Sequence, residues 1–366
     1  MRSRASFLTA GVVFAFVLVT ARTNLKAAEG DVAWSADFAA FTAMEPIDTH
    51  AHAFKVDPQF YAFLRKLHVH LLDIVVANKD DEAFPTLEPK IAAAQAFVKN
   101  SHGQAVLCTT FDPFQFSSPK FSEDAIGQLN RDFAVGAVAV KIWKNVGMEL
   151  KDASGHFVLP DDPRLKPIYE DIASHGKTLI AHLAEPNSCW LPPNKNSPDY
   201  SYYTQHPEWY MYNQSDHPKK ATILQARDHI LEQNPQLRVV GAHLGSMEMD
   251  LDGLGKRFDR YPNFAVDVAA RVAYLAIQPR EKVRQFLIKY QDRIVYGTDL
   301  SLSERQSSEA AAKTWAKHYT TDWTFFSTSR TLEYEGHTAQ GLELPGTVLH
   351  KLYHDNAVRW IPGVLP

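Results

Sequence analysis

Two histidines near the start of the chain have the spacing of a metal-binding pair. His50 and His52 lie in the stretch Ile47–His52, which follows an apolar approach. Residues two apart on a β-strand point to the same side, so two imidazoles at the end of one strand can reach one metal ion. Imidazole is a common ligand of Zn and also suits Fe, Ni and Cu. Taken alone the pair is a weak signal, because two solvated loop histidines give the same pattern.

Single polar residues also end later apolar segments of the chain. They are Lys141 in the segment 137–142, His182 in 178–183, His243 in 238–243 and Asp299 in 293–299. Each has an ordinary explanation by itself, since a histidine can be hydrogen-bonded in a core, a lysine can reach solvent along its stem and an aspartate can cap a helix. Their common position within the segments indicates a shared site.

The segments that carry these residues alternate with helical patterns. The predicted strands cover residues 47–52, 69–76, 105–110, 137–142, 178–183, 238–243, 264–268 and 293–299. The predicted helices cover 34–41, 60–67, 88–100, 122–133, 165–175, 221–233, 252–261 and 279–290, and helical segments that include 345–360 close the chain. This alternation predicts an α/β fold, a (β/α)8 TIM barrel, as a single domain over residues 29–366. A doubly wound open sheet is the alternative, but no glycine-rich phosphate loop follows the first strand.

A (β/α)8 barrel explains why the polar residues come at strand ends. All its strands are parallel, so their carboxyl ends lie on one rim and polar side chains there converge over the barrel mouth. We therefore expect the two histidines of the first strand, Lys141, His182, His243 and Asp299 to lie close together.

The composition is that of a globular protein with no preference for nucleic acid. The chain has 366 residues, of which 45% are hydrophobic, and a net charge of -4. Its lysines and arginines are scattered, whereas nucleic-acid-binding proteins gather them in a stripe. The two cysteines, Cys108 and Cys189, are too far apart in sequence to form a close metal-ligand pair.

The first 28 residues have the pattern of an export signal. Arg2 and Arg4 precede the apolar run 7–19, and small residues around 19–21 or 27–28 offer cleavage sites. The run is short for a membrane span, so we prefer a signal peptide over an uncleaved anchor. The mature protein is then expected to be periplasmic or secreted, with no stable membrane span. Export would permit a disulfide between Cys108 and Cys189.

Three stretches resemble a known family. They are Asp48–His52, Gly241–Ser246 and Tyr296–Asp299. Together with Lys141 and His182 they resemble the amidohydrolase superfamily of metal-dependent hydrolases, and most closely its "amidohydrolase 2" branch. That branch includes aromatic-acid decarboxylases, such as aminocarboxymuconate semialdehyde decarboxylase, and lactone hydrolases. The resemblance covers essentially the whole mature chain.

The resemblance implies a role for each polar residue. His50, His52 and His182 would be metal ligands, and Asp299 would be the fourth ligand or would bond the water on the metal. His243 would contact substrate or act in acid–base chemistry. The implied metal is divalent, and we expect Zn²⁺.

Lys141 leaves the number of metal ions open. In two-metal members of the superfamily a lysine on the fourth strand is carbamylated and bridges the ions, and His182 and His243 would then hold the second ion. Without that modification, Lys141 would hold a substrate carboxylate. Lys144 competes for the inward position, and only one of the two can point inward because they lie on opposite faces if the strand continues. We favour Lys141 because it directly follows the Ala-Val run.

The long segment 184–218 is the best indication of substrate. It is rich in aromatic residues, which are Trp190, Tyr200, Tyr202, Tyr203, Trp209, Tyr210 and Tyr212. Trp190 and Trp209 are candidates for stacking on a substrate ring, but the aromatic residues fit a small core of the segment or a subunit contact equally well. Arg271 could bind a substrate carboxylate, although a pairing with Asp267 or a helix end is preferred.

These features predict a secreted metal-dependent hydrolase that acts on a small amide, ester or lactone. The alternative is a metal-dependent decarboxylase of an aromatic or unsaturated carboxylic acid, since the same ligands suit both reactions. A third hypothesis is an inactive barrel that only binds a ligand, against which the intact ligand positions argue. The expected partner is a small-molecule substrate, and a homo-oligomer remains open.

Overall fold

The computed structural model describes residues 36–365, and the predicted export signal lies outside them. A short helix, α1 (Ala36–Thr42), leads into the first strand. The strands are β1 (Ile47–Ala53), β2 (His70–Ile74), β3 (Ala105–Thr110), β4 (Ala139–Ile142), β5 (Thr178–Ala181), β6 (Arg238–Gly241), β7 (Phe264–Asp267), β8 (Ile294–Val295) and β9 (Leu300–Leu302). The main intervening helices are α2 (Pro58–Leu67), α3 (Leu87–Asn100), α4 (Phe121–Ala134), α6 (Lys166–Ser174), α8 (Lys220–Gln233), α10 (Leu251–Arg260) and α12 (Arg280–Lys289).

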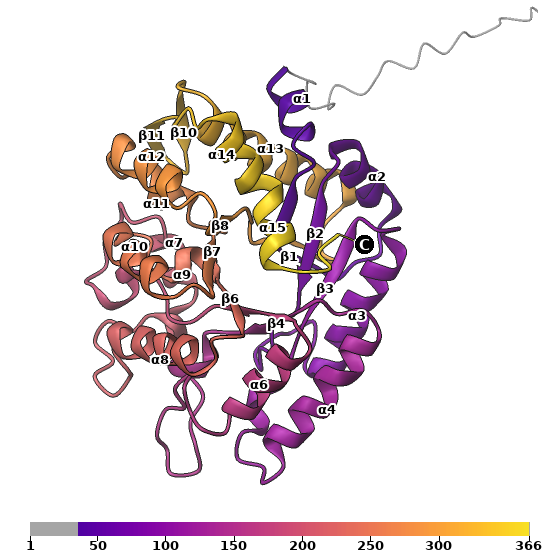
Figure 1. Ribbon diagram of the computed structural model, residues 1–366, viewed down its shortest axis with the longest axis vertical. Helices are drawn as coiled ribbons and strands as arrows, with labels where there is room; N and C mark the ends of the chain where they lie inside the picture. The colour runs from indigo at the N-terminus through magenta and orange to yellow at the C-terminus, as the bar shows by residue number, and fades with distance from the viewer. Residues whose placement is uncertain (1–35, 366) are drawn as a thin grey trace, which may run out of the picture. The chain divides into compact units, whose positions relative to one another are not determined.

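The strands form one parallel sheet whose two edges belong to the same stretch of chain. The order is β8-β7-β6-β5-β4-β3-β2-β1-β9, and β8 and β9 are separated only by Tyr296–Asp299. Those four residues run alongside β1, since the Thr49 amide donates to the Tyr296 carbonyl (3.0 Å) and the Asp299 amide donates to the His50 carbonyl (2.7 Å). The predicted (β/α)8 barrel is therefore confirmed, with its eighth strand broken into β8 and β9. Figure 1 shows β1, β2 and β3 side by side in this sheet.

The interior of the sheet is filled by small and branched apolar side chains. Residues such as Leu72, Ile180 and Val240 form one buried cluster with Trp360 at the end of the last helix, α15 (Asn356–Trp360). The Thr178 hydroxyl at the start of β5 donates to the Trp360 carbonyl (2.6 Å). The closing helix therefore covers the amino-terminal ends of the strands, and the carboxyl ends are left for the site.

The region after β9 departs from the sequence expectation, which placed only helices there. A long helix, α13 (Ser308–Ser327), is followed by an antiparallel hairpin of β10 (Thr331–Tyr334) and β11 (His337–Gln340). Glu335 and Gly336 form its two-residue turn, with φ values of 47° and 84°. Positive φ at both positions is what tight hairpin turns need, and a Glu-Gly pair is a weak sequence signal for it.

Two further expectations concern the cysteines and membrane spans. Cys108 on β3 and Cys189, just beyond β5, are both buried free thiols, so the disulfide that export would permit is not formed. Between residues 36 and 365, none of the helices combines the length and the apolar character needed to cross a membrane.

A buried carboxylate ties the hairpin to the barrel and gives a stability prediction. Asp322 of α13 accepts hydrogen bonds from the hydroxyls of Tyr296 (2.8 Å) and Tyr334 (2.5 Å). We expect Asp322→Ala to lower the free energy of unfolding by about 2–4 kcal/mol, because two buried hydroxyls lose their acceptor. Urea denaturation measures the change.

The matched control for Asp322 is the exposed Asp259, which accepts a hydrogen bond from the Tyr290 hydroxyl (3.0 Å). Water can replace that acceptor, so Asp259→Ala should change the free energy of unfolding by no more than about 0.5 kcal/mol. Equal losses in the two variants would contradict the structural role assigned to Asp322.

Candidate active site

The carboxyl ends of the strands surround a cavity of about 620 Å³. The six polar residues expected at the barrel mouth all line it, and they are His50, His52, Lys141, His182, His243 and Asp299. Arg271, which follows β7, lines it too. The structure therefore brings together the candidates that were selected by their position at strand ends.

The hydrogen bonds of the first two histidines fix which ring nitrogen is free. His50 Nδ1 lies 2.8 Å from Asp267 Oδ2, and His52 Nδ1 lies 2.7 Å from the Ile74 carbonyl oxygen. Both partners are acceptors, so each Nδ1 carries a proton, and in the neutral imidazole each Nε2 keeps a lone pair. This is the outer hydrogen bonding that orients metal-binding histidines.

The free nitrogens face a carboxylate. Asp299 Oδ1 lies 3.1 Å from His52 Nε2 and 3.5 Å from His50 Nε2. Three electron-pair donors at this spacing repel one another unless a cation lies among them. The ligand atoms of His50, His52 and Asp299 all lie within 4.8 Å of one another, so this set fits a divalent metal ion.

The charge of Asp299 also suits a ligand. Burial by itself would raise its pKa, but the neighbouring His243, His52 and His50 lower the pKa well below the ordinary aspartate value. Burial lowers the pKa of His50 well below the ordinary value, which keeps its imidazole neutral. A neutral imidazole and an ionised carboxylate are the forms that bind metals.

His182 and His243 form the adjoining wall of the cavity. Their rings are 4.2 Å apart between centroids, and His243 Nδ1 lies 2.8 Å from the Ala269 carbonyl oxygen. His182 Nε2 is buried and, among the described residues, has no hydrogen-bond partner. It lies outside the set of three ligand atoms, so its role as a further metal ligand stays a prediction that the unpaired nitrogen favours.

The backbone at this rim adopts left-handed conformations. Residues with φ between 52° and 70° follow four successive strands, and they are Ala184, His243, Leu244, Ser246, Ala270 and Asp299. Such conformations cost roughly 1–2 kcal/mol each in a residue with a side chain. Their concentration at one rim is typical of a functional site. Gly297 allows the last turn to approach, since a Cβ there would lie 2.9 Å from His50 Cβ.

Comparison with known families agrees with this geometry. A family model described as amidohydrolase matches residues 47–362. The chain belongs to the amidohydrolase family. A comparison with curated protein sequences gave no match.

Solved structures share the fold of this amidohydrolase at low identity. An uncharacterised TIM-barrel protein from Bordetella bronchiseptica is 15% identical with a TM-score of 0.51, over 87% of this chain and 99% of that chain. A dihydroxybenzoic acid decarboxylase from a Polaromonas species, with bound manganese and 2-nitroresorcinol, is 12% identical with a TM-score of 0.51, over 86% and 96% of the chains. A 2,6-dihydroxybenzoate decarboxylase complexed with 2,6-dihydroxybenzoate has the same identity and TM-score, 12% and 0.51, over 86% and 98%.

Both candidate lysines of the amidohydrolase line the cavity, so the expectation that only one points inward is wrong. Strand β4 ends at Ile142, and the alternation of faces does not extend to Lys144. Lys141 Nζ lies 3.0 Å from His50 Nε2, beside the metal ligands. Lys144 instead donates to Glu185 and to the Tyr202 hydroxyl.

Arg271 pairs with a residue that the sequence did not single out. Its Nη2 lies 3.6 Å from Glu185 Oε2, whereas Asp267 is engaged by His50. Of the two preferred pairings of Arg271, with Asp267 or with a helix end, the one with Asp267 is therefore wrong. Asp267 ends β7 as the other candidates end their strands, so the rule that selected them would also have selected it.

The tryptophans expected to stack on substrate lie outside the lining of this cavity. Trp209 is buried against Trp143, with ring centroids 5.1 Å apart, and Trp190 Nε1 lies 3.4 Å from the Pro218 carbonyl oxygen. The aromatic residues that line the cavity are Phe54, Trp143 and Tyr202. The segment 184–218 thus has a small core of its own, which was the alternative interpretation.

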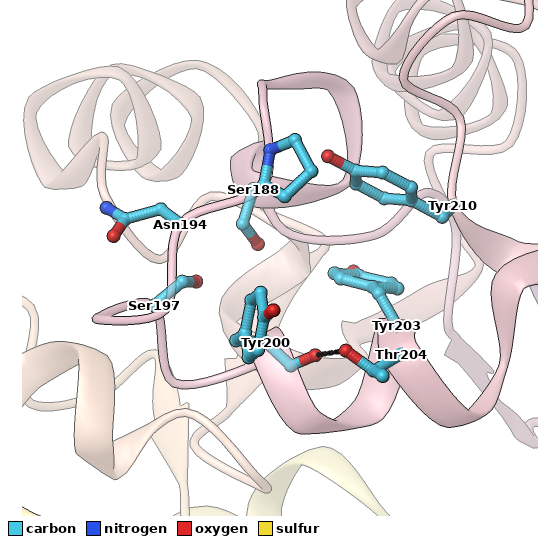
Figure 2. Close-up of a pocket in the computed structure, with 8 residues that line it drawn as sticks. Ser188, Asn194, Ser197, Tyr200, Tyr203, Thr204 and Tyr210 are labelled. Carbon is cyan, nitrogen blue, oxygen red and sulfur yellow. Dashed lines mark hydrogen bonds between the residues drawn. The ribbon is translucent and has the colours of Figure 1, made fainter.

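The same segment encloses a second, smaller pocket of about 220 Å³. Figure 2 shows Tyr200, Tyr203 and Tyr210 around it, together with polar residues such as Ser188. This pocket contains none of the metal-binding candidates. We therefore assign the chemistry to the cavity at the barrel mouth.

A buried aspartate holds together the two parts of the chain that carry the candidate metal ligands. Asp48 accepts hydrogen bonds from the His50 amide (3.1 Å), the Thr298 amide (3.0 Å), the Thr298 hydroxyl (2.7 Å) and the Tyr319 hydroxyl (3.1 Å). All four partners are donors, so the arrangement requires the ionised carboxylate. Burial raises the pKa of Asp48 to about 6.

This pKa predicts how metal retention depends on pH. Below about pH 6 the Asp48 carboxyl takes up a proton and no longer accepts all four hydrogen bonds. Burial keeps the pKa of His50 well below the ordinary value, so Asp48 takes up its proton before His50 does. We expect the metal content after dialysis to fall as the pH drops through about 6, as measured by mass spectrometry of the bound metal.

Asp48→Asn mimics the protonated carboxyl at every pH. The variant should retain little metal even at neutral pH, because its amide group presents hydrogens to the donors of Thr298 and His50. Full metal content in this variant at neutral pH would show that Asp48 does not control the site.

Proposed function

We propose that this amidohydrolase is a metal-dependent hydrolase that acts on a small amide, ester or lactone. The observation that carries the proposal is the convergence of His50 Nε2, His52 Nε2 and Asp299 Oδ1 on one point of the cavity. The proposed ion is Zn²⁺, which imidazole and carboxylate ligands suit. A bound divalent cation would lower the pKa of water at the site and polarise a substrate carbonyl.

The protein's own residues supply the proton transfers. Asp299 is ionised, since its neighbours hold its pKa well below the ordinary value, and it can accept a proton from the attacking water and pass it to the leaving group. The Nδ1 proton of His243 is engaged by the Ala269 carbonyl, which leaves Nε2 as an acceptor. We therefore infer that His243 acts as a base or a ligand. Lys141 is the donor available to a developing negative charge.

A decarboxylase is the second candidate function. Lys141 and Arg271 both line the cavity, and two cations beside a metal site could bind a substrate carboxylate. Two solved structures with this fold are decarboxylases of dihydroxybenzoates. We prefer the hydrolase because the Arg271 charge is already paired with Glu185 (3.6 Å) and because the predicted export favours a reaction that needs only water.

We further propose that the enzyme is exported, to the periplasm or the medium, and that its substrate is a small molecule. The support is the pattern of the first 28 residues, with its basic start and apolar run. A cavity of about 620 Å³ is of the size that small-molecule sites have.

Removal of one proposed ligand gives the first test. We expect His52→Ala to lower the metal affinity by more than about 100-fold. Loss of an outer hydrogen-bond partner alone lowers it roughly 10–100-fold, and His52 is a proposed ligand itself. The variant should also lose hydrolysis of the probe ester p-nitrophenyl acetate. Metal per chain is measured on the purified full-length protein.

The control is His70→Ala. His70 is the first residue of β2, so it lies at the end of the strand opposite the cavity. Its Nδ1 lies 3.0 Å from the Gly103 carbonyl oxygen. The His70→Ala variant should keep the metal. A His52→Ala variant that retains the full metal content would overturn the ligand assignment.

Lys141→Ala distinguishes one ion from two. A carbamylated Lys141 would bridge two ions, with His182 and His243 holding the second, so the variant would lose at least one ion. A single site would keep its one ion in the variant. Release of carbon dioxide from the probe 2,6-dihydroxybenzoate, with no hydrolysis of a panel of esters, amides and lactones, would favour the decarboxylase over the hydrolase.

A further inference from the structure

One wall of the cavity comes from the long segment between β5 and α8. The segment 184–218 contains one short helix, α7 (Tyr200–Gln205), and two single turns, Asn187–Trp190 and Pro207–Trp209. Tyr202 of α7 lines the cavity with the metal-binding candidates. The position of this wall therefore depends on what holds the segment against the rim.

Lys144 reaches this segment from the end of a different strand. Its side chain is buried, and its ammonium group donates to Glu185 and to the Tyr202 hydroxyl (2.6 Å). The same nitrogen lies 4.3 Å from the ring centroid of Trp209, 4.9 Å from that of Tyr202 and 5.4 Å from that of Trp143. Three aromatic rings and one carboxylate around a cation make an aromatic cage.

We propose that Lys144 fastens the segment 184–218 to the barrel rim and thereby fixes Tyr202 as a wall of the active-site cavity. Tyr202 and Trp209 belong to the segment, whereas Trp143 and Lys144 follow β4. The ammonium group is one of the contacts that join the two parts, and it is the one that holds Tyr202 directly. The Tyr274 hydroxyl also donates to Asp199, and the Asn187 amide donates to Glu248. Lys144 is a positioning residue, because it acts through Tyr202.

The choice of lysine at this place supports a fastening role. A buried ammonium group is unfavourable unless it is paired and hydrogen-bonded, whereas an apolar side chain would pack among three rings without that requirement. A charged donor adds direction, since it fixes the Tyr202 hydroxyl as well as the ring. Buried ion pairs of this kind can specify one arrangement among several of similar packing.

Glu185 extends the connection toward the reacting end of the cavity. Its Oε2 lies 3.6 Å from Arg271 Nη2, and its Oε1 lies 3.9 Å from His182 Nε2. The Tyr203 hydroxyl also donates to Glu185 (3.4 Å). The Glu185 carboxylate therefore faces Lys144, two side chains of the barrel rim and one further tyrosine of its own segment. That this wall selects substrate rests on the proposed function, but the fastening itself does not.

Hydrogen–deuterium exchange of the metal-loaded, full-length protein tests the fastening without any substrate. In Lys144→Met we expect amides in 198–212 to exchange faster by about tenfold or more, because the segment opens locally once its charged contact is lost. Metal per chain should stay at the wild-type value, since the ligands His50, His52 and Asp299 lie outside the cage.

Lys90→Met is the matched control. Lys90 is also a buried lysine of the cavity wall, and its ammonium group pairs with Asp81 (2.7 Å) beyond β2, far in sequence from the segment 184–218. Its loss should speed exchange near residues 78–90 and leave 198–212 unchanged. Unchanged exchange at 198–212 in Lys144→Met, or equal acceleration there in Lys90→Met, would overturn the proposal.

The protein could fail to fold in Lys144→Met, because Glu185 loses a partner for its buried charge. A second variant then tests the proposal. Lys144→Ala opens the cage, and the probe propylammonium chloride should restore slow exchange at 198–212, whereas the neutral probe propanol should not. Equal effects of the two probes would show that the site is only an apolar gap. Loss of metal in every Lys144 variant would contradict the claim that Lys144 acts on Tyr202 and not on the metal ligands. Failure of all probe substrates with the exchange result intact would count against the proposed function alone.

Discussion

The carboxylate of Asp48 is the group on which the rest of the site depends. It accepts one hydrogen bond from the backbone of β1 and two from Thr298, in the turn that separates β8 from β9. The first and last strands of the barrel thus meet at one buried charge, and each carries a ligand of the proposed metal beside that contact. Because this closure brings His50 beside Asp299, the same strand pairing also builds the proposed metal site. An error in the pairing of these strands would displace His50 from Asp299.

Charged groups surround the cavity in layers. Next to the proposed ion are the histidines of β1 and the ionised Asp299, and behind them Asp267 orients His50. Farther out, Lys144 and Arg271 share the single carboxylate of Glu185, so this outer group keeps one positive charge. Lys141 is a further cation, directly beside His50. The wall opposite Asp299 therefore favours a substrate or transition state with negative charge.

The sequence alone predicted the barrel and the polar residues at its mouth, because buried parallel strands are continuous apolar runs and an ionisable residue in such a run is conspicuous. It could not predict where regular pairing stops. Lys144 was expected to face away from the cavity, yet the chain leaves the strand geometry after Ile142 and turns it inward. The hairpin β10–β11 was missed because Glu335 adopts a left-handed conformation that its residue type does not suggest. Glu185 was missed because its importance comes from partners that lie far apart in sequence, Lys144 and Arg271.

The helix that covers the amino-terminal ends of the strands has a consequence for folding. Trp360 and Ile361 belong to the same buried apolar cluster as Leu72, which lies far from them in the sequence. The edge of β1 is likewise completed by residues 300–302. Contacts between segments so far apart form slowly, because a long stretch of chain must be ordered before they contribute. We therefore expect closure of the barrel to be a late step of folding.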